Sequence, residues 1–192
     1  MSFARARALA IVGVLVVAAL VLVVTALVRD RQSSARYAAG GCGPGKIKID
    51  TRLPDQSAIK LNVYNGTGQR NSNTKDKAHP VVNGVPNLAE AVANDLKNRG
   101  FQISKVDSNP QKYDGVAKLS YGPKTVAAAT VVRAYFLGEA EQGGFDLKRT
   151  DDTVDVLLGS GFKQLGSRTD VSGMWAELGK PSPPPGTCDG NA

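Results

Sequence analysis

The chain has 192 residues, of which 42% are hydrophobic, and its formal net charge is +7. This length allows one domain with additional segments. Residues 1–36 contain five arginines and one aspartate, so they carry +4 and the remaining residues carry +3. That charge is too small for the basic surface of a typical nucleic-acid-binding domain, so we expect no nucleic acid among the partners.

Residues 9–28 form an apolar segment in which Thr25 is the one polar side chain. Twenty helical residues span about 30 Å, the thickness of a bilayer core. A cleaved signal peptide is the alternative, but its apolar region is shorter and is followed by small residues, whereas Arg29, Asp30 and Arg31 follow here. We therefore predict a cytoplasmic N-terminus over residues 1–8, a single-pass transmembrane helix over 9–28 and a tether over 29–57.

The two cysteines, Cys42 and Cys188, stand at opposite ends of the segment that follows the apolar stretch. A disulfide joining the ends of a domain outside the cytoplasm explains this placement, and two unrelated free thiols are the alternative. Two cysteines and a single histidine, His79, do not make a zinc site, so we expect no metal. The cysteines thus favour a cell-membrane protein whose C-terminal domain lies outside the cytoplasm.

Alternation over residues 59–64 predicts a strand with one buried face, because Ile59, Leu61 and Val63 share one side. The strand ends at residues 65–68, Asn-Gly-Thr-Gly, which turn the chain sharply. Such a turn can leave backbone N–H groups free for an anion. It lacks the third glycine or the Gly-Lys-Ser/Thr of a nucleotide loop. A structural turn is the stronger interpretation, and a nucleotide site is the alternative.

The remaining elements follow a polar loop over residues 69–83. A helix is expected to begin at Asn87, an N-cap with Glu90 in capping-box position, and to stop at Gly100. Strands are expected over 101–107, 116–121 and 153–158, and a second helix over 124–137, because each segment carries the apolar period of its element. Ile47 and Ile49 alternate with polar residues, which is typical of a short edge strand.

The predicted order is strand, helix, strand, strand, helix, strand. Each helix has a single apolar stripe, so we expect a two-layer α/β domain with both helices on one face of a mixed four-stranded sheet. The strands that begin near residues 59 and 101 should be parallel. The short connection over 108–115 predicts that the strands on either side of it pair as antiparallel neighbours.

Residues 163–192 are interpreted as a C-terminal extension with a proline-rich tail. Met174, Trp175 and Leu178 are spaced so that they can form a short helix that docks on the core. A lone tryptophan is usually packed, so an apolar anchor is the stronger interpretation of Trp175 and a ligand platform is the alternative.

Four segments of the predicted domain resemble the LytR C-terminal domain family: IKLNVYNGTG, VPNLAEAVANDLKNRGFQI, AKLSYGP and DTVDVLLGSGF. The resemblance covers about residues 58–162 and implies a bacterial domain outside the membrane. Members often follow a catalytic domain that attaches polymers to peptidoglycan. That domain is absent from this sequence, so the resemblance transfers no transferase activity. In the family the helix follows the turn almost directly, whereas residues 69–83 intervene here.

The anchor, the cysteines and the resemblance favour a non-catalytic module that supports cell-envelope integrity. Its expected partners are a cell-wall polymer (peptidoglycan or an attached glycan) or envelope assembly proteins. The alternative is an enzyme acting on wall polymers or lipid-linked wall precursors. Asp151, Asp152 and Asp155 are the densest acids but crowd the start of a strand, and His79 has no evident serine or cysteine partner. We therefore expect no catalytic residue and no cofactor.

Candidate ligand-binding residues lie at the turn and in the loop that follows it. The end of a strand is where open α/β sheets tend to bind ligands, and loops on a rigid scaffold often carry binding residues. Glycine N–H donors beside basic side chains can hold the carboxylates or phosphates of a wall polymer, although a solvated loop is the simpler interpretation. The candidates are Asn65, Gly66, Thr67, Gly68, Arg70, Lys75 and Lys77.

Overall fold

The computed structural model describes residues 42–68, 84–109 and 112–191, together with residues 16, 19, 21 and 23. The chain divides into two compact units, residues 1–43 with residue 192, and residues 44–191. The predicted transmembrane segment 9–28 lies outside the described residues except at those four positions, which are helical. Within the described part of the chain, no helix combines the length and the apolar character needed to cross a membrane.

A mixed sheet of five strands forms the centre of the second unit, in the order β3-β2-β6-β4-β5. Its members are β2 (Lys60–Asn65), β3 (Gln102–Ser108), β4 (Ala117–Tyr121), β5 (Glu141–Phe145) and β6 (Thr153–Leu158). Strands β3 and β6 are parallel to β2, β4 is antiparallel to β6, and β5 is parallel to β4. The α/β class and the parallel pairing of β2 with β3 are confirmed.

Two expectations about the sheet are wrong. It has five strands and not four, because the segment of β5 contains Gly143 and Gly144 and so lacks the alternation that marks a strand. Strands β3 and β4 are not neighbours, since β4 pairs with β6. In that pair, buried Ala117 and Leu119 of β4 lie beside buried residues of β6. The mostly exposed β3 is left at the edge.

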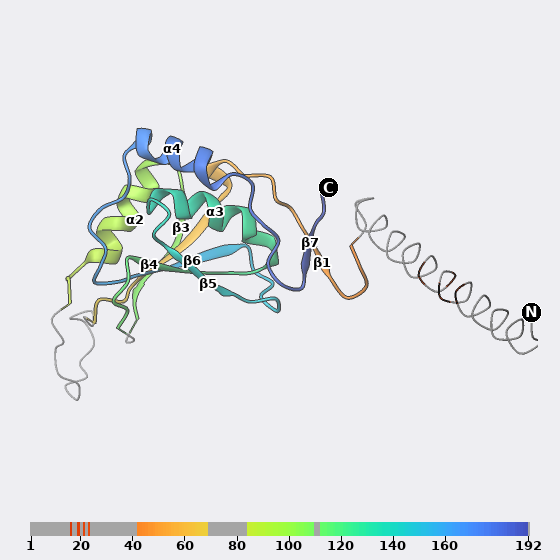
Figure 1. The fold of residues 1–192 in the computed structure, drawn as a ribbon. Coiled ribbons are helices and arrows are strands. Elements are labelled where there is room, and N and C mark those ends of the chain that lie inside the picture. Colours follow the sequence, from red (N-terminus) through yellow and green to blue (C-terminus); the bar gives the residue numbers. More distant parts are fainter. Residues whose placement is uncertain are drawn as a thin grey trace, which may run out of the picture. The chain divides into compact units, whose positions relative to one another are not determined.

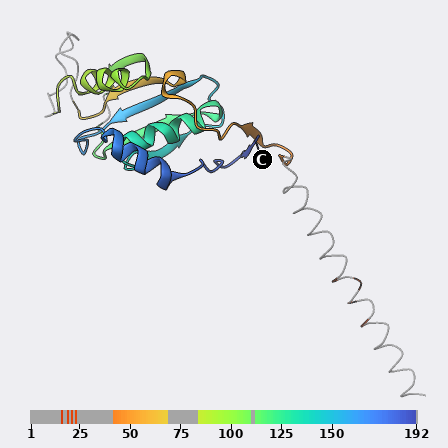
Figure 2. The same cartoon turned by 90° about the horizontal axis from the view of Figure 1, so that it is seen from above.

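Helices cover one face of this sheet. Val63, Val156 and Leu119 lie side by side across three strands and are fully buried, whereas Asn62 and Asp155, which alternate with them, are half-exposed. The helices α2 (Leu88–Asn98) and α3 (Val126–Tyr135) lie over the buried face (Figure 1), and the view from above shows them over different parts of the sheet, with strands visible between them (Figure 2). The two-layer arrangement with both helices on one face is therefore confirmed.

The start of α2 differs from the predicted capping box. Asn87 has a left-handed backbone, with φ of 57°, and its side chain accepts no hydrogen bond from the first turn. An N-cap side chain can accept such a bond when its own backbone is extended, which is not the conformation of Asn87. The end of the helix is as predicted, since Gly100 adopts a φ of +101° that favours glycine.

A third helix, α4 (Arg168–Leu178), packs against α3 on the helical side of the sheet (Figure 1). Met174, Trp175 and Leu178 are partly buried and pack against the hydrophobic core, so the predicted docking helix is confirmed. Ser167 and Asp170 form a capping box at its start: the Asp170 carboxylate accepts from the Ser167 N–H at 3.0 Å and from its hydroxyl at 2.6 Å. This cap fixes where α4 begins.

A small two-stranded parallel sheet joins the first and last elements of residues 44–191. It pairs β1 (Ile47–Ile49) with β7 (Thr187–Asp189), and the Thr51 hydroxyl donates to the Asp189 carboxylate at 2.8 Å. The predicted short strand at Ile47 is therefore present, although it lies outside the main sheet. Cys42 and Cys188 are both disulfide-bonded, and because the chain has two cysteines, the bond joins them, as predicted.

Candidate functional site

The polar groups of the turn after β2 form hydrogen bonds with one another and with neighbouring parts of the protein. The Asn65 side chain donates to the Val85 carbonyl at 2.8 Å and accepts from the N–H and the hydroxyl of Thr67, at 3.1 and 2.7 Å. The Gly66 N–H donates to the Leu158 carbonyl at 2.8 Å. Asn65 and Thr67 are 3% and 1% exposed. Two of the backbone donors that the sequence offered to an anion are thus already satisfied inside the protein.

Gly66 is required by a close approach and not by a left-handed backbone. A Cβ atom at this position would lie 2.6 Å from the Leu157 side chain and 2.8 Å from the Leu158 carbonyl oxygen. Gly68 is the residue of the turn with a positive φ, of 94°. The other candidate ligand-binding residues, Arg70, Lys75 and Lys77, lie outside the described residues.

A first cavity, of about 450 Å³, lies between α2 and the edge strand β3. We call it the α2–β3 groove; its lining includes Asn65, Glu90, Asn94, Lys97, Val106 and Asp107. At the Asp107 end of the groove, the neighbouring Ser108 N–H and the ammonium of Lys105 stabilise the Asp107 carboxylate and hold its pKa below the usual range. The groove therefore runs from an acidic end, with Glu90 and Asp107, to a basic end at Lys97.

A second cavity, of about 300 Å³, lies beside α4 and is called here the α4 groove. Residues with polar or aromatic side chains line much of it: Gln56, Asn98, Arg99, Tyr135, Arg168, Ser172 and Trp175. The rings of Tyr135 and Trp175 meet edge to face, with centroids 6.2 Å apart. The groove thus combines two aromatic rings, two guanidinium groups and several neutral hydrogen-bonding groups.

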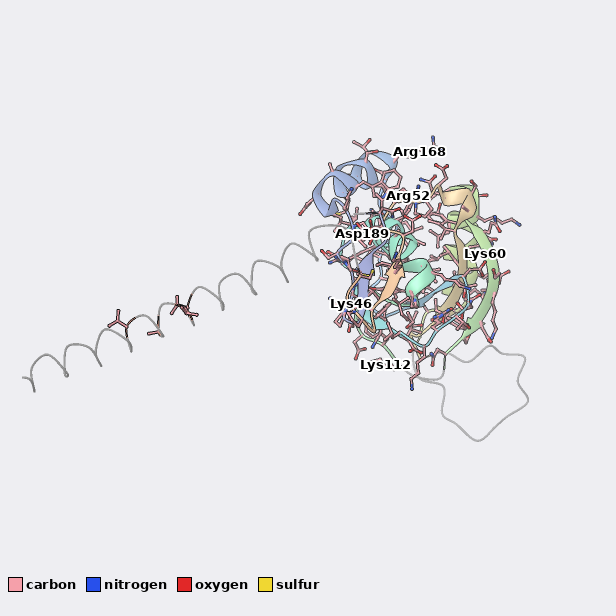
Figure 3. The ribbon with its side chains drawn as sticks, turned by 90° about the vertical axis from the view of Figure 1, so that its right-hand side faces the viewer. Lys46, Arg52, Lys60, Lys112, Arg168 and Asp189 are labelled. Carbon is pink, nitrogen blue, oxygen red and sulfur yellow. The ribbon has the colours of Figure 1, made fainter. Side chains whose placement is uncertain are left out.

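The two arginines of the α4 groove differ in their freedom. The Arg99 side chain is held by the Asp95 carboxylate at 2.9 Å and by the Gly166 carbonyl at 2.6 Å, with its guanidinium over the Tyr135 ring. Arg168, the first residue of α4, is exposed at the surface (Figure 3) and has no ion-pair partner among the described residues. Arg99 therefore shapes the groove, while Arg168 can reach a ligand.

Trp175 contributes a buried polar group to the residues that line the α4 groove. Its indole Nε1 is buried and has no hydrogen-bond partner within the described residues. A buried donor without an acceptor costs about 1–3 kcal/mol, so such a group in a native protein needs an explanation. An acceptor on a bound ligand or water supplies one. The apolar-anchor interpretation of Trp175 is borne out by its packing, and the ligand role remains a proposal.

The signal for the α4 groove was present in the sequence but was not recognised. Arg168, Val171, Ser172 and Trp175 are three, four and seven residues apart, which places them on one side of a helix. The sequence alone assigned Trp175 to the core and did not include Arg168 or Ser172 among the candidates. Tyr135 and Arg99 come from other elements, and only the fold brings them to the same groove.

The acidic residues considered for catalysis are paired with a cation. Arg149 contacts Asp151 and Asp155, each at 2.9 Å, on the uncovered side of the sheet. Partial burial opposes the charge of Asp151, but hydrogen bonds from Thr153 and from Arg149 outweigh it and lower the pKa of Asp151. The Asp151 carboxylate is thus held as an anion by structural partners, unlike a general acid. His79 lies outside the described residues, and among those described no group of three potential metal ligands is found.

A comparison with solved structures finds the soluble domain of a conserved hypothetical secreted protein from Mycobacterium marinum. The two are 21% identical, the match covers 78% of this chain and 92% of the other, and the TM-score is 0.43. A likeness at this level carries no argument about function. No curated protein matches the chain.

The family comparison is specific. Residues 58–162 match the model of the LytR C-terminal domain, described as "LytR cell envelope-related transcriptional attenuator". The matched region begins just before β2 and ends four residues after β6, so it contains the whole main sheet with α2 and α3. The match covers more than half of the 192 residues, and the chain therefore belongs to the LytR C-terminal domain family.

Proposed function

We propose that this protein is a non-catalytic module of the cell envelope, held at the membrane by residues 9–28, whose domain outside the cytoplasm binds a cell-wall polymer. The family description, which refers to the cell envelope, supports the compartment. The disulfide supports it too, since such bonds persist in oxidising surroundings. The apolar length of residues 9–28 supports the anchor.

The observation that carries the binding function is the unmet indole N–H of Trp175 in the α4 groove. A hydroxyl or carboxylate oxygen of a glycan would accept from it. Trp and Tyr rings combine apolar area with a polar atom, which suits the mixed surface of a sugar. Arg168 at the rim adds a planar set of donors that matches carboxylates and phosphates. The favoured ligand is a wall glycan that carries carboxylate or phosphate groups.

Binding by the full chain in detergent to insoluble peptidoglycan tests this proposal. In a sedimentation assay, Arg168→Glu should weaken binding about tenfold or more, because a charge-assisted hydrogen bond contributes about 1.5–3 kcal/mol. The salt dependence of binding should also fall. Lys124→Glu is the matched control, because Lys124 is exposed and precedes α3, at the opposite end from Tyr135. This control should bind as the unmodified protein does.

The loop that follows the turn provides the competing location. Neutralising Arg70, Lys75 and Lys77 together should leave binding unchanged if the α4 groove is the site. Loss of binding in this triple variant, with Arg168→Glu unaffected, would move the site to the turn and its loop. Full binding in both variants would contradict both locations. Release of soluble wall fragments by the unmodified protein would favour the alternative of an enzyme.

A further inference from the structure

Strand β3 is an edge strand whose outer side pairs with no described strand. The Asn109 N–H donates inward to the Asn65 carbonyl. Because successive residues of a strand alternate in the direction of their backbone groups, the N–H and C=O of Val106 point away from β2. The Val106 side chain is 43% exposed, although it lies on the helical side of the sheet, beside Val63. The edge thus offers free backbone groups and an apolar side chain.

The opposite edge of the sheet is protected in a way that β3 is not. Strand β5 contains Gly143 and Gly144, and its register with β4 shifts between Lys118 and Ser120. Such irregular, glycine-containing edges pair poorly with other strands. Strand β3 has seven residues, no proline and no glycine, and its one irregularity lies before Lys105. An open, regular edge of this kind is a template for another strand.

We propose that two copies of this protein associate through β3, antiparallel about a two-fold axis that passes at Val106. In this register the two Val106 residues exchange both backbone hydrogen bonds, and their side chains meet. Lys105 then faces Asp107 of the partner subunit, and Asp107 faces the partner subunit's Lys105. These side chains already form an ion pair within one strand, at 3.1 Å. The charges of β3 are therefore self-complementary, as an interface with two-fold symmetry requires.

The charges on helix α2, which lies above β3, are also arranged to fit this two-fold axis. It connects two parallel strands, so it runs opposite to β3, and its N-terminal end lies beside Asp107 in the α2–β3 groove. Its exposed flank along the groove is formed by Glu90, Asn94 and Lys97. Among the described residues, no ion-pair or hydrogen-bond partner is found for these three side chains. Asn94 lies at the centre of this flank and the opposite charges lie toward its two ends.

The two-fold axis that pairs β3 with itself also places α2 antiparallel to the α2 of the partner subunit, on the same face of the joined sheet. Glu90 then faces the partner subunit's Lys97, and Lys97 faces the partner subunit's Glu90, with Asn94 near the axis. The β3 pairing and the α2 charge pairs are thus satisfied by the same two-fold axis. A partner of uniform charge or a random peptide would satisfy one end of the groove and oppose the other, which favours a second copy as the occupant.

Cysteine cross-linking of the full chain in detergent tests the register. The native cysteines are bonded, so Val106→Cys introduces the one free thiol. Two such residues opposite each other lie about 5.5 Å apart at Cα, within the range of a disulfide. Mild oxidation should give a covalent dimer on a non-reducing gel. Leu147→Cys is the control: Leu147 is 39% exposed and follows β5, the strand at the opposite edge of the sheet from β3, so this variant should stay monomeric.

Charge reversal tests the helix contacts independently. Glu90→Lys or Lys97→Glu alone should raise the dimer dissociation constant about tenfold in analytical ultracentrifugation, because each places like charges opposite each other twice. The double variant Glu90→Lys/Lys97→Glu restores opposite charges and should return the constant to within about threefold of its original value. A monomer at all concentrations, or a dimer that ignores these charges and does not cross-link at Val106→Cys, would overturn the proposal.

Discussion

The turn at residues 65–68 and the α4 groove form an instructive pair. The turn contains two glycines, an asparagine and a threonine, the residue types that a sequence search associates with anion binding. Yet the Asn65 side chain and the Gly66 N–H have protein partners within 3.1 Å. The α4 groove carries no recognised motif, and there the Trp175 indole N–H has no partner within the described residues.

This difference shows that the accounting of hydrogen bonds separates a structural turn from a candidate binding site better than composition does. Buried polar groups in native proteins are almost always paired. A fully paired cluster stabilises the fold, and a ligand would have to break existing bonds to use it. An unpaired donor beside a cavity gains a partner when a ligand arrives. Substitutions in the turn should therefore reduce stability, and substitutions in the groove should reduce binding.

The largest expected effect is that of Gly66→Ala on stability. The new Cβ would lie 2.8 Å from the backbone oxygen of Leu158, and a backbone atom cannot move aside by a change of rotamer. Overpacking of this kind costs about 1–3 kcal/mol and occasionally more. We expect a loss near the upper end, about 3 kcal/mol, in urea unfolding with an unchanged m-value. Stability equal to that of the unmodified protein would mean that the turn is loosely packed.

A second substitution in the turn, Asn65→Ala, should cost about 2 kcal/mol. It removes a side chain that is 3% exposed and leaves the Val85 carbonyl and the Thr67 N–H without their partner. Stranding buried groups of this kind costs about 1–3 kcal/mol. Thermal unfolding measures the loss. If wall binding fell while the unfolding temperature stayed constant, the turn and not the α4 groove would be the binding site.

Trp175→Phe should have the opposite signature. It keeps an aromatic ring beside Tyr135 and removes the unpaired N–H, so the lost packing and the removed penalty offset each other. We expect the free energy of unfolding to change by less than about 1 kcal/mol. Binding to peptidoglycan should weaken severalfold, because the hydrogen bond to the glycan is lost. Unchanged binding would show that the indole N–H does not contact the polymer.

The main elements of the fold were predictable because local sequence determines them. Period-two alternation located β2, β4 and β6, and the period of the helix located α2 and α3. The order of strands was less accessible, since it depends on which edges match in three dimensions. Strand β4 could pair with β3 or β6, and the choice was decided by buried Ala117 and Leu119 lying beside β6. Strand β5 was missed because its glycines remove the alternation.

The candidate site was predictable only in fragments. The sequence identified Trp175 as a member of a docking helix, and that position is correct. It could not bring Arg99 of the connection after α2 and Tyr135 of α3 to the same groove, because these contacts are long-range. It also could not show that the Trp175 N–H lacks a partner, since hydrogen-bond satisfaction depends on the packed structure.

The smallest expected effect concerns the cap that positions α4 and thereby the groove. The hydroxyl and the N–H of Ser167 donate to the Asp170 carboxylate and hold the pKa of Asp170 below its usual value. A carboxyl group whose pKa is lowered by folding stabilises the protein above its unfolded pKa of about 3.9, and this contribution is lost as the pH falls through the folded value.

Asp170→Asn keeps an acceptor oxygen but removes the charge. At pH 7 the variant should therefore unfold at a slightly lower temperature than the unmodified protein. The two unfolding temperatures should converge as the pH falls below about 4, where protonation makes the aspartic acid resemble the asparagine. Scanning calorimetry at several pH values measures this convergence, and a difference that stays constant down to pH 3 would mean that the charge of Asp170 does not stabilise the cap.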